Sequence, residues 1–132
     1  MITIKDVSKW YGAVQVLRNC STYVDKGEVM VVCGPSGSGK STLIKCVNGL
    51  EPFQQGRIIV DGVSVGDAGR RLPKLRARIG MVFQHFELFP HLTVMRNLTL
   101  AQVKVLRRSE KEAVAKGRRL LERVGLSEHA QK

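Results

Sequence analysis

The stretch that decides the fold is Gly34-Pro35-Ser36-Gly37-Ser38-Gly39-Lys40-Ser41. It matches G-x-x-x-x-G-K-[ST], the pattern of a loop that cradles phosphate groups. The glycines allow positive φ and let the backbone approach an anion with no Cβ in the way. Successive N–H groups then converge on phosphate oxygens, and the helix that follows adds its N-terminal dipole.

Three side chains at the end of this stretch carry specific chemistry. Lys40 can reach the β- and γ-phosphates of a nucleotide as a point charge. The Ser41 hydroxyl can bind Mg²⁺, a hard cation that prefers oxygen ligands. Thr42, the next residue, can add a phosphate contact. The motif therefore predicts a site for a nucleotide with its Mg²⁺.

The residues on either side of the loop have the pattern that this motif requires. Val29–Cys33 is apolar throughout and predicts a strand buried on both faces. Leu43, Val47 and Leu50 recur at helical spacing, and Gly49 stands where a C-terminal cap is expected. A strand, a glycine-rich loop and a helix in this order favour a phosphate-binding site over an ordinary glycine-rich turn.

Alternation, turn residues and capping residues predict the other elements. Strands are expected at 2–7, 14–17, 20–24, 57–60, 63–65 and 79–83, a turn at 25–28 and a short helix at 74–78. Thr93 can cap one helix, and Ser109 with Glu112 forms a capping box for another, which Gly125 ends. Its apolar face is expected to hold Ala113, Gly117, Leu120, Leu121 and Val124, and Ser127 is expected to cap a further helix.

The phosphate-binding loop alone leaves the class of enzyme open. The D-x-x-G and N-K-x-D motifs of GTPases do not occur, whereas small-molecule kinases and helicases remain possible. The segment nearest to a Walker B strand is Ile58-Ile59-Val60-Asp61. Because Gly62 and a second apolar run follow it, and no Glu adjoins Asp61, we interpret Asp61-Gly62 as a hairpin turn.

The composition of the chain shows an excess of positive charge, which bears on the kind of partner it binds. The 132 residues include 22 Lys and Arg against 11 Asp and Glu, a formal net charge of +11. This excess indicates an anionic partner such as a nucleotide, nucleic acid or an acidic membrane surface, or simply a soluble basic surface. Basic residues concentrate at 70–78 and 104–123, the second of which we interpret as a solvated helix face.

Cysteine and histidine usage indicates no metal or redox site. Three widely spaced cysteines, Cys20, Cys33 and Cys46, predict buried free thiols in a reducing compartment. His85, His91 and His129 have no metal-ligand spacing. No signal peptide or membrane-spanning run is recognisable, which predicts a soluble, cytoplasmic chain.

Further segments surround the loop in a characteristic order. They are Tyr11 in Lys9-Trp10-Tyr11-Gly12, Gln84 after Gly80-Met81-Val82-Phe83, and then Phe86-Glu87-Leu88-Phe89-Pro90-His91-Leu92-Thr93-Val94. In this order the chain resembles, over its whole length, the ATP-binding subunits of ABC transporters. Within that family it is most similar to the bacterial importers of polar amino acids, in particular glutamate and aspartate.

The resemblance implies a role for each of these residues. Tyr11 would be the A-loop aromatic that stacks on adenine, and Val16 would pack beside the base and ribose. Gly34–Ser41 with Thr42 would hold the phosphates of ATP. Gln84 would be the Q-loop glutamine, which with Ser41 lies near Mg²⁺ and the attacking water, so that Lys40 and Gln84 are the catalytic candidates. Each role has a plainer structural alternative. Tyr11 could be a half-buried aromatic at a strand end, and Gln84 could be an ordinary loop residue. The remaining apolar residues could belong to an ordinary core; they are Phe86, Leu88 and Phe89.

The resemblance also implies the fold class. It is α/β, a P-loop NTPase of the ABC type with an antiparallel β subdomain, a RecA-like core and the start of a helical subdomain. Residues 1–132 would be the N-terminal part of one ATP-binding domain. The L-S-G-G-Q signature, the Walker B aspartate with its catalytic glutamate, and the switch histidine do not occur in this sequence.

The function implied is ATP hydrolysis coupled to amino-acid import at the cytoplasmic face of the bacterial inner membrane. The partners would be transmembrane permease subunits that contact Phe86–Thr93, a second ATP-binding subunit in a nucleotide-sandwich dimer and, indirectly, a periplasmic receptor. Because the general base is missing from these residues, we expect this chain to bind ATP without efficient hydrolysis. The alternatives are a non-catalytic nucleotide-binding fragment and a basic domain that binds anions or nucleic acid non-specifically.

Overall fold

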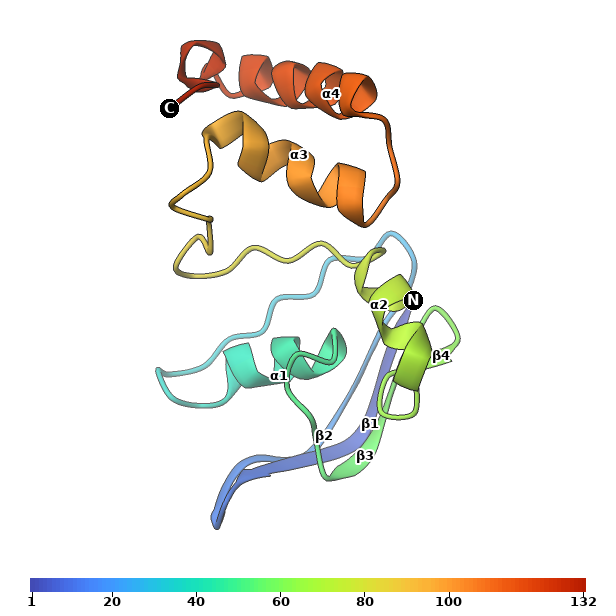
Figure 1. The fold of residues 1–132 in the computed structure, drawn as a ribbon. Helices are drawn as coiled ribbons and strands as arrows, with labels where there is room; N and C mark the ends of the chain where they lie inside the picture. The colour runs from blue at the N-terminus through green and yellow to red at the C-terminus, as the bar shows by residue number, and fades with distance from the viewer. The chain divides into compact units, whose positions relative to one another are not determined.

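The computed structural model describes residues 1–132 and divides into two compact units, Met1–Gly80 and Met81–Lys132 (Figure 1). The first unit contains β1 (Ile2–Tyr11), β2 (Val14–Val24), α1 (Lys40–Val47), β3 (Gln55–Val60), β4 (Val63–Ser64), the 3₁₀ turn η1 (Gly69–Arg71) and α2 (Leu72–Arg76). The second contains α3 (Val94–Lys104), α4 (Glu110–Arg123) and the 3₁₀ turn η2 (Ser127–His129).

An antiparallel sheet with strand order β2-β1-β3-β4 forms one layer of the first unit. The sequence predicted two short strands where the structure has the single strand β2. Between Cys20, which pairs with Val7, and Leu17, which pairs with Lys9, the register shifts. Asn19 takes a φ of 42° there. The break that the sequence indicated is therefore an irregularity within one strand, which keeps its pairing with β1 on both sides.

The core of the first unit lies between this sheet and the helices α1 and α2. Its buried members are Ile4, Val7, Leu17, Cys46, Ile58, Val60, Val65 and Leu75. Leu43 and Val47 of α1 pack against this cluster, as the helical spacing predicted, whereas Leu50 is exposed. Gly49, with a φ of 72°, follows the helix as the expected C-terminal glycine.

The turn between β3 and β4 is the hairpin that Asp61-Gly62 predicted. Both residues have positive φ, 46° and 78°, as a tight antiparallel hairpin requires. The Asp61 carboxylate accepts from the N-terminal amine at 3.0 Å and from Arg78 at 2.8 Å. The hydrogen bond from the N-terminal amine is the main cause that lowers the pKa of Asp61, and Arg78 adds to it. Asp61 therefore has a structural role in the turn, where its carboxylate pairs with the N-terminal amine and Arg78.

Two predicted strands are absent, and this corrects the sequence analysis. Neither Val29–Cys33 nor 79–83 is a strand, and neither belongs to the sheet. Val29 is 92% exposed and Val82 is 95% exposed, whereas Ile79 packs half-buried against the core, so neither run is buried throughout. A strand needs a neighbour to satisfy its backbone groups, which an apolar run does not provide by itself. Cys33 is exposed for the same reason, contrary to the expectation of buried thiols.

The short helix of the first unit begins earlier than predicted. It spans Leu72–Arg76 rather than 74–78, with Pro73 in its first turn. Proline suits that position because its missing N–H has no partner in the first turn of a helix.

The helices of the second unit begin at the predicted caps. Thr93 Oγ1 accepts from the Arg96 N–H at 3.1 Å, and Ser109 with Glu112 forms the complete capping box. Ala113, Gly117 and Leu121 are buried on α4, where a Cβ at Gly117 would lie 2.7 Å from Met95 Sδ.

The expectations for Leu120, Val124 and Ser127, on α4 and just after it, are wrong. Leu120 and Val124 are exposed rather than on the buried face of α4. Ser127 caps no α-helix and begins only a 3₁₀ turn, with no side-chain cap hydrogen bond.

No helix in the structure has the length and apolar character to cross a bilayer.

The capping box of α4 allows a direct test. We expect Ser109→Ala to lower the free energy of unfolding by about 1 kcal/mol, because the Glu112 N–H loses its acceptor. Ser109→Ala can be compared with Ser127→Ala in urea titrations, with amide exchange to localise the effect. Ser127 makes no cap hydrogen bond, so its variant should change little.

The box also predicts a dependence on pH. Hydrogen bonds from the Ser109 side chain and backbone lower the pKa of Glu112. Its contribution is therefore present above the ordinary pKa of a glutamate and is lost as the pH falls through the lowered value. Equal acid sensitivity of the wild type and Ser109→Ala would contradict this origin.

Candidate functional site

The glycine-rich loop leads directly into helix α1. Gly37 and Gly39 have φ of 79° and 94°, which side chains with a Cβ rarely adopt. Gly39 is the N-cap and supplies no side-chain cap, and the first hydrogen bond of the helix joins the Leu43 N–H to the Gly39 carbonyl at 2.9 Å. The N–H groups of residues 40–42 therefore make no hydrogen bond within the chain. They are free donors at the positive end of a helix dipole, suited to an anion.

The Lys40 ammonium lies against this loop. Its Nζ donates to the carbonyls of Gly34 and Pro35, each at 2.7 Å, and to Ser38 Oγ at 3.3 Å. A Cβ at Gly34 would lie 2.8 Å from the same Ser38 Oγ, so the loop is tightly wound here. A positive charge and free N–H donors thus come from adjacent residues of one segment, the donor set that phosphate oxygens require.

Oxygen donors for a cation are also present. Ser41 is exposed in the first turn of α1, so its hydroxyl is accessible to a cation. Its neighbour Thr42 is half-buried in the first turn of α1. A hydroxyl beside a phosphate-binding loop is the type of ligand that Mg²⁺ accepts, so the residues present fit this ion.

Strand β2 supports the end of the loop. A Cβ at Gly39 would lie 3.0 Å from the Val16 carbonyl oxygen and 3.0 Å from Leu17 Cδ2. The structure therefore brings Val16, predicted to pack beside the base and ribose, into contact with the loop. Glycine is required at position 39 both for its φ and for this close approach.

Tyr11 is the last residue of β1, next to the turn that joins β1 to β2. It pairs with Val14, two residues before Val16 on β2. Tyr11 is 46% exposed, and Lys9 Nζ lies 4.2 Å from the centroid of its ring. The aromatic ring is thus partly available to a planar ligand. The contact with Lys9 was not predicted, because a lysine in a strand pattern suggests an exposed face.

Gln84 and Phe86–Thr93 belong to the second unit. Gln84 is exposed in a turn, and Phe86, Leu88 and Phe89 are exposed by 81%, 67% and 51%. The alternative that these three residues form ordinary core is therefore wrong. Phe86 and Glu87 have positive φ, 63° and 50°, an uncommon conformation for consecutive residues other than glycine.

One helical side chain, Asn97 of α3, holds this exposed segment in place. Its Oδ1 accepts from the Phe89 N–H at 2.9 Å, and its Nδ2 donates to the carbonyls of Phe89, Leu92 and Thr93. Sequence reasoning missed Asn97, since an asparagine in the first turn of a helix has no motif of its own. It lies four residues after the cap Thr93, close enough to satisfy a loop that returns over the helix N-terminus.

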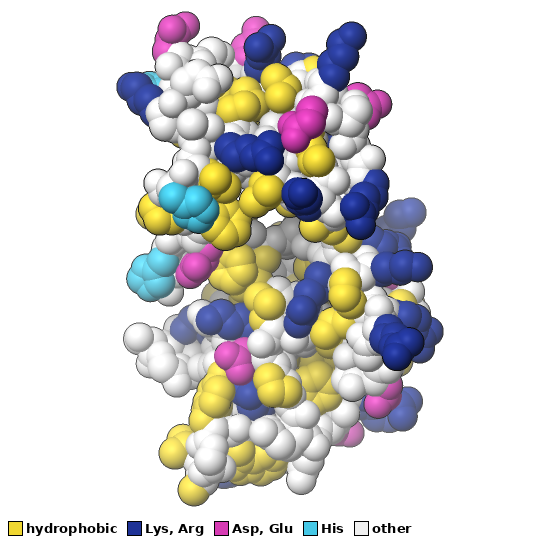
Figure 2. All heavy atoms as spheres, viewed as in Figure 1, with side chains coloured by type: hydrophobic (Ala, Val, Ile, Leu, Met, Phe, Trp, Pro, Cys, Tyr) yellow, Lys and Arg dark blue, Asp and Glu magenta, His cyan; other side chains and the backbone are white.

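Basic residues gather on the η1–α2 segment, where Figure 2 shows a concentration of Lys and Arg. Arg76 donates to the carbonyls of Asn48 at 3.0 Å and Gly49 at 2.6 Å, at the C-terminal end of α1. Arg78 is paired with Asp61. Part of the positive charge that the sequence assigned to an anionic partner is therefore used within the fold.

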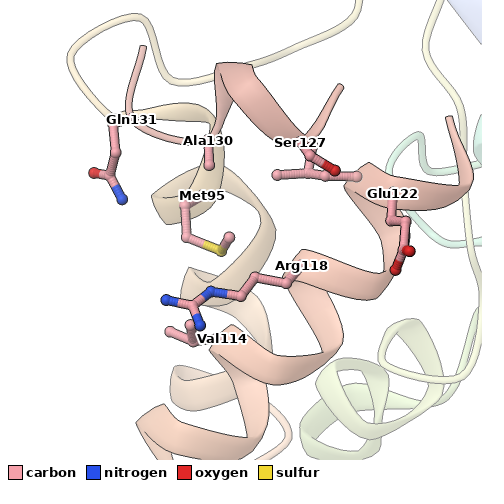
Figure 3. A pocket seen from close by; sticks show the side chains of 8 residues that line it. Met95, Val114, Arg118, Glu122, Ser127, Ala130 and Gln131 are labelled. Carbon is pink, nitrogen blue, oxygen red and sulfur yellow. The ribbon is translucent and has the colours of Figure 1, made fainter. Parts of the chain in front are cut away.

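A cavity of about 390 Å³ lies in the second unit, and none of the residues that line it was predicted for the site (Figure 3). It is lined by Met95, Val114, Arg118, Leu121, Glu122, Ser127, Ala130 and Gln131. Arg118 and Glu122 are its charged side chains, and they point in different directions from α4. No group of three or more His, Cys, Asp or Glu side chains in the structure is placed to hold a metal ion.

A family model and solved structures match this fold. The family model described as ABC transporter matches residues 17–132. The ATP-binding cassette MJ0796, solved as a dimer bound to ADP and Pi, superposes with a TM-score of 0.91 and 31% identity, covering 99% of this chain and 60% of that one. The chain therefore belongs to the ABC transporter family, and the predicted fold class, a P-loop NTPase of the ABC type, is confirmed.

Curated relatives extend the comparison. The glutamate/aspartate import ATP-binding protein GltL of Escherichia coli (strain K12) is 70% identical over the whole chain, which covers 55% of that protein. The glutamine transport ATP-binding protein GlnQ of Geobacillus stearothermophilus is 50% identical over 98% of the chain and 54% of its own length. The chain thus spans about half the length of the curated relatives that it matches.

The contact between Gly39 and β2 predicts unequal effects of two glycine substitutions. Gly37→Ala and Gly39→Ala each introduce a Cβ at positive φ, which costs about 1 kcal/mol. A Cβ at Gly37 meets nothing within 4 Å, whereas one at Gly39 meets the Val16 backbone. We therefore expect Gly39→Ala to be less stable by a further 1–3 kcal/mol, roughly the cost of overpacking. Urea unfolding measures both, and equal losses would show that φ alone matters.

Proposed function

We propose that this chain binds Mg²⁺–ATP as the ATP-binding subunit of an importer of polar amino acids. The observation that carries the proposal is the loop Gly34–Ser41, in which free N–H donors and the Lys40 ammonium adjoin at the start of α1. Residues 1–132 form, in this proposal, the N-terminal part of one ABC ATP-binding domain. Membership of the ABC transporter family supports the nucleotide as ATP.

Each residue has a proposed role in holding the nucleotide. The loop from Gly34 to Ser41, with Thr42, binds the phosphates, and Tyr11 stacks on the base with Val16 beside it. Ser41 and Gln84 provide oxygen ligands to Mg²⁺. The ion, when bound, neutralises phosphate charge and orients the terminal phosphoryl group. Lys40 adds a fixed positive charge, and Gln84 is the candidate to orient a water molecule.

The transported substrate follows from similarity alone. Relatives named for glutamate/aspartate import and for glutamine transport both match nearly the whole chain, and the first is more similar in sequence. We therefore propose glutamate or aspartate as the substrate. The choice of substrate would rest with the receptor and membrane subunits, so no residue of this chain is assigned to it.

The segment Phe86–Thr93 is the proposed contact with a transmembrane permease subunit. It is apolar and exposed, and Asn97 holds its second half in a defined conformation. Exposed apolar side chains on an ordered loop are typical of a docking surface. A second copy of the ATP-binding subunit is the other proposed partner, as in the dimeric cassette to which this fold is similar. A complex of this kind would lie at the cytoplasmic face of the bacterial inner membrane.

One prediction from this proposal concerns the phosphate site. We expect the purified chain to bind Mg²⁺–ATP in calorimetric titrations, and Lys40→Ala to reduce the affinity at least about tenfold, as loss of a charged hydrogen bond implies. Lys45→Ala is the matched control, because it removes the same charge from the last turn of the same helix. Equal losses in both variants would reduce the effect to net charge and refute the proposed site.

The same preparation tests turnover. The sequence holds no acidic pair that could act as Walker B aspartate and general base. We therefore expect no phosphate release by the chain above that of Lys40→Ala. Turnover that depends on Lys40 would contradict the proposal that these residues bind ATP without hydrolysing it.

Another prediction concerns the site for the adenine base. We expect Tyr11→Ala to weaken Mg²⁺–ATP binding by about 1–3 kcal/mol, the range measured for a base stacked on an aromatic side chain. Binding of inorganic tripolyphosphate, which has no base, should be unchanged. Tyr23→Ala, a substitution of the other tyrosine, on β2, serves as the control. An unchanged affinity for ATP would exclude Tyr11 from the base site.

A further inference from the structure

Lys9 is the largest fully buried side chain of the protein, with 2% of the side chain exposed. Its Nζ donates to the Pro52 carbonyl at 2.6 Å and lies 3.4 Å from the Glu51 carboxylate. The same atom lies 4.2 Å from the centroid of the Tyr11 ring. A buried ammonium is costly unless it is paired, and here each neighbour is a partner of the appropriate kind.

An irregularity in β1 determines where Lys9 points. The register shifts between Ile4 and Val7 in the pairing with β2 and between Lys5 and Ser8 in the pairing with β3, and Asp6 there has a φ of 51°. A bulge of this kind shifts the alternation of a strand and redirects the side chains that follow. Val7 and Lys9 are both buried beyond it, and Lys9 reaches the ring of Tyr11 two residues further on.

The partners of Lys9 also connect Tyr11 to the helix of the phosphate-binding loop. Glu51 and Pro52 follow α1, and the Glu51 N–H donates to the Lys45 carbonyl of α1 at 3.2 Å. Lys9 therefore contacts both the aromatic ring and the segment that follows α1. Because α1 begins at the phosphate-binding loop, these contacts fix the position of the ring relative to the phosphate site.

We propose that Lys9 is a positioning residue for the base of the bound nucleotide. A cation over one face of an aromatic ring fixes the ring by electrostatic attraction and draws electron density from it. The ring of Tyr11, a residue that is 46% exposed, then stacks more favourably on an electron-rich purine. Lys9 thereby contributes to the preference for a triphosphate that carries a base. The inference rests on the proposed function, specifically on Tyr11 as the residue that binds the base.

The test compares two ligands in one series of variants. Mg²⁺–ATP and Mg²⁺–tripolyphosphate are titrated by calorimetry into the wild type, Lys9→Met, Lys9→Arg, Tyr11→Ala and Lys9→Met/Tyr11→Ala. We expect Lys9→Met to lose about three- to tenfold in affinity for ATP, within the range of a cation–π contact, and none for tripolyphosphate. Lys9→Arg keeps a cation and should retain most of the affinity. In the Tyr11→Ala background, Lys9→Met should have no further effect.

The ratio of the two affinities separates positioning from a purely structural role. Lower stability reduces the folded fraction of the protein and so lowers the apparent affinity for both ligands by the same factor. The ratio of the two affinities is therefore unchanged. If Lys9→Met does not fold, Lys9→Gln replaces it, since its amide can donate to the Pro52 carbonyl but carries no charge. Equal loss for both ligands, or losses that add in the double variant, would overturn the role of Lys9.

Failure of the underlying function gives a different result. If the wild type binds neither ligand, or if Lys40→Ala binds tripolyphosphate as well as the wild type does, the phosphate site itself is wrong. If tripolyphosphate binding depends on Lys40 but Tyr11→Ala leaves ATP affinity unchanged, the base site is wrong and the inference on Lys9 fails with it. Only a base-specific loss in Lys9→Met that disappears in Tyr11→Ala supports the inference.

Discussion

The packing of helix α1 against the antiparallel sheet is the interaction on which the candidate site depends. Cys46 of α1 is fully buried in the cluster that includes Val7 and Ile58, and burial is the main cause that raises the pKa of its thiol. Because close-packed side chains resist displacement, this contact fixes the axis of the helix. The phosphate-binding loop ends at Gly39, the N-cap of the same helix, and so its position follows from the core.

The two ends of α1 are treated in opposite ways. At its N-terminus no side chain caps the backbone donors, which remain available to an anion. Beyond its C-terminus two cations satisfy carbonyls: Arg76 binds those of Asn48 and Gly49, and Lys9 binds that of Pro52. Positive charge is favourable at the negative end of the helix dipole. The fold thus stabilises the end that has no ligand to bind and leaves the other end free for one.

The second unit combines regular helix caps with an irregular, exposed apolar loop. Thr93 and Asn97 make hydrogen bonds around the N-terminus of α3, so the loop that precedes the helix has a defined path without a strand or helix of its own. Rigid support for an exposed loop is a common way to present a binding surface. In the proposed function, this arrangement presents a contact surface to another subunit.

Local signals in the sequence predicted the conformation of the glycine-rich loop, its helix, the Asp61-Gly62 hairpin and both caps, because each depends on a few neighbouring residues. The strands expected at 29–33 and 79–83 were wrong, since a strand exists only where another segment supplies its hydrogen bonds. The pairing of Lys9 with Tyr11 and Glu51, and of Asn97 with its loop, also required the tertiary structure. By itself, then, the sequence determined the chemistry of the candidate phosphate site, whose available donors are consecutive residues. Only the tertiary structure decided what surrounds it, because those contacts join residues far apart in the chain.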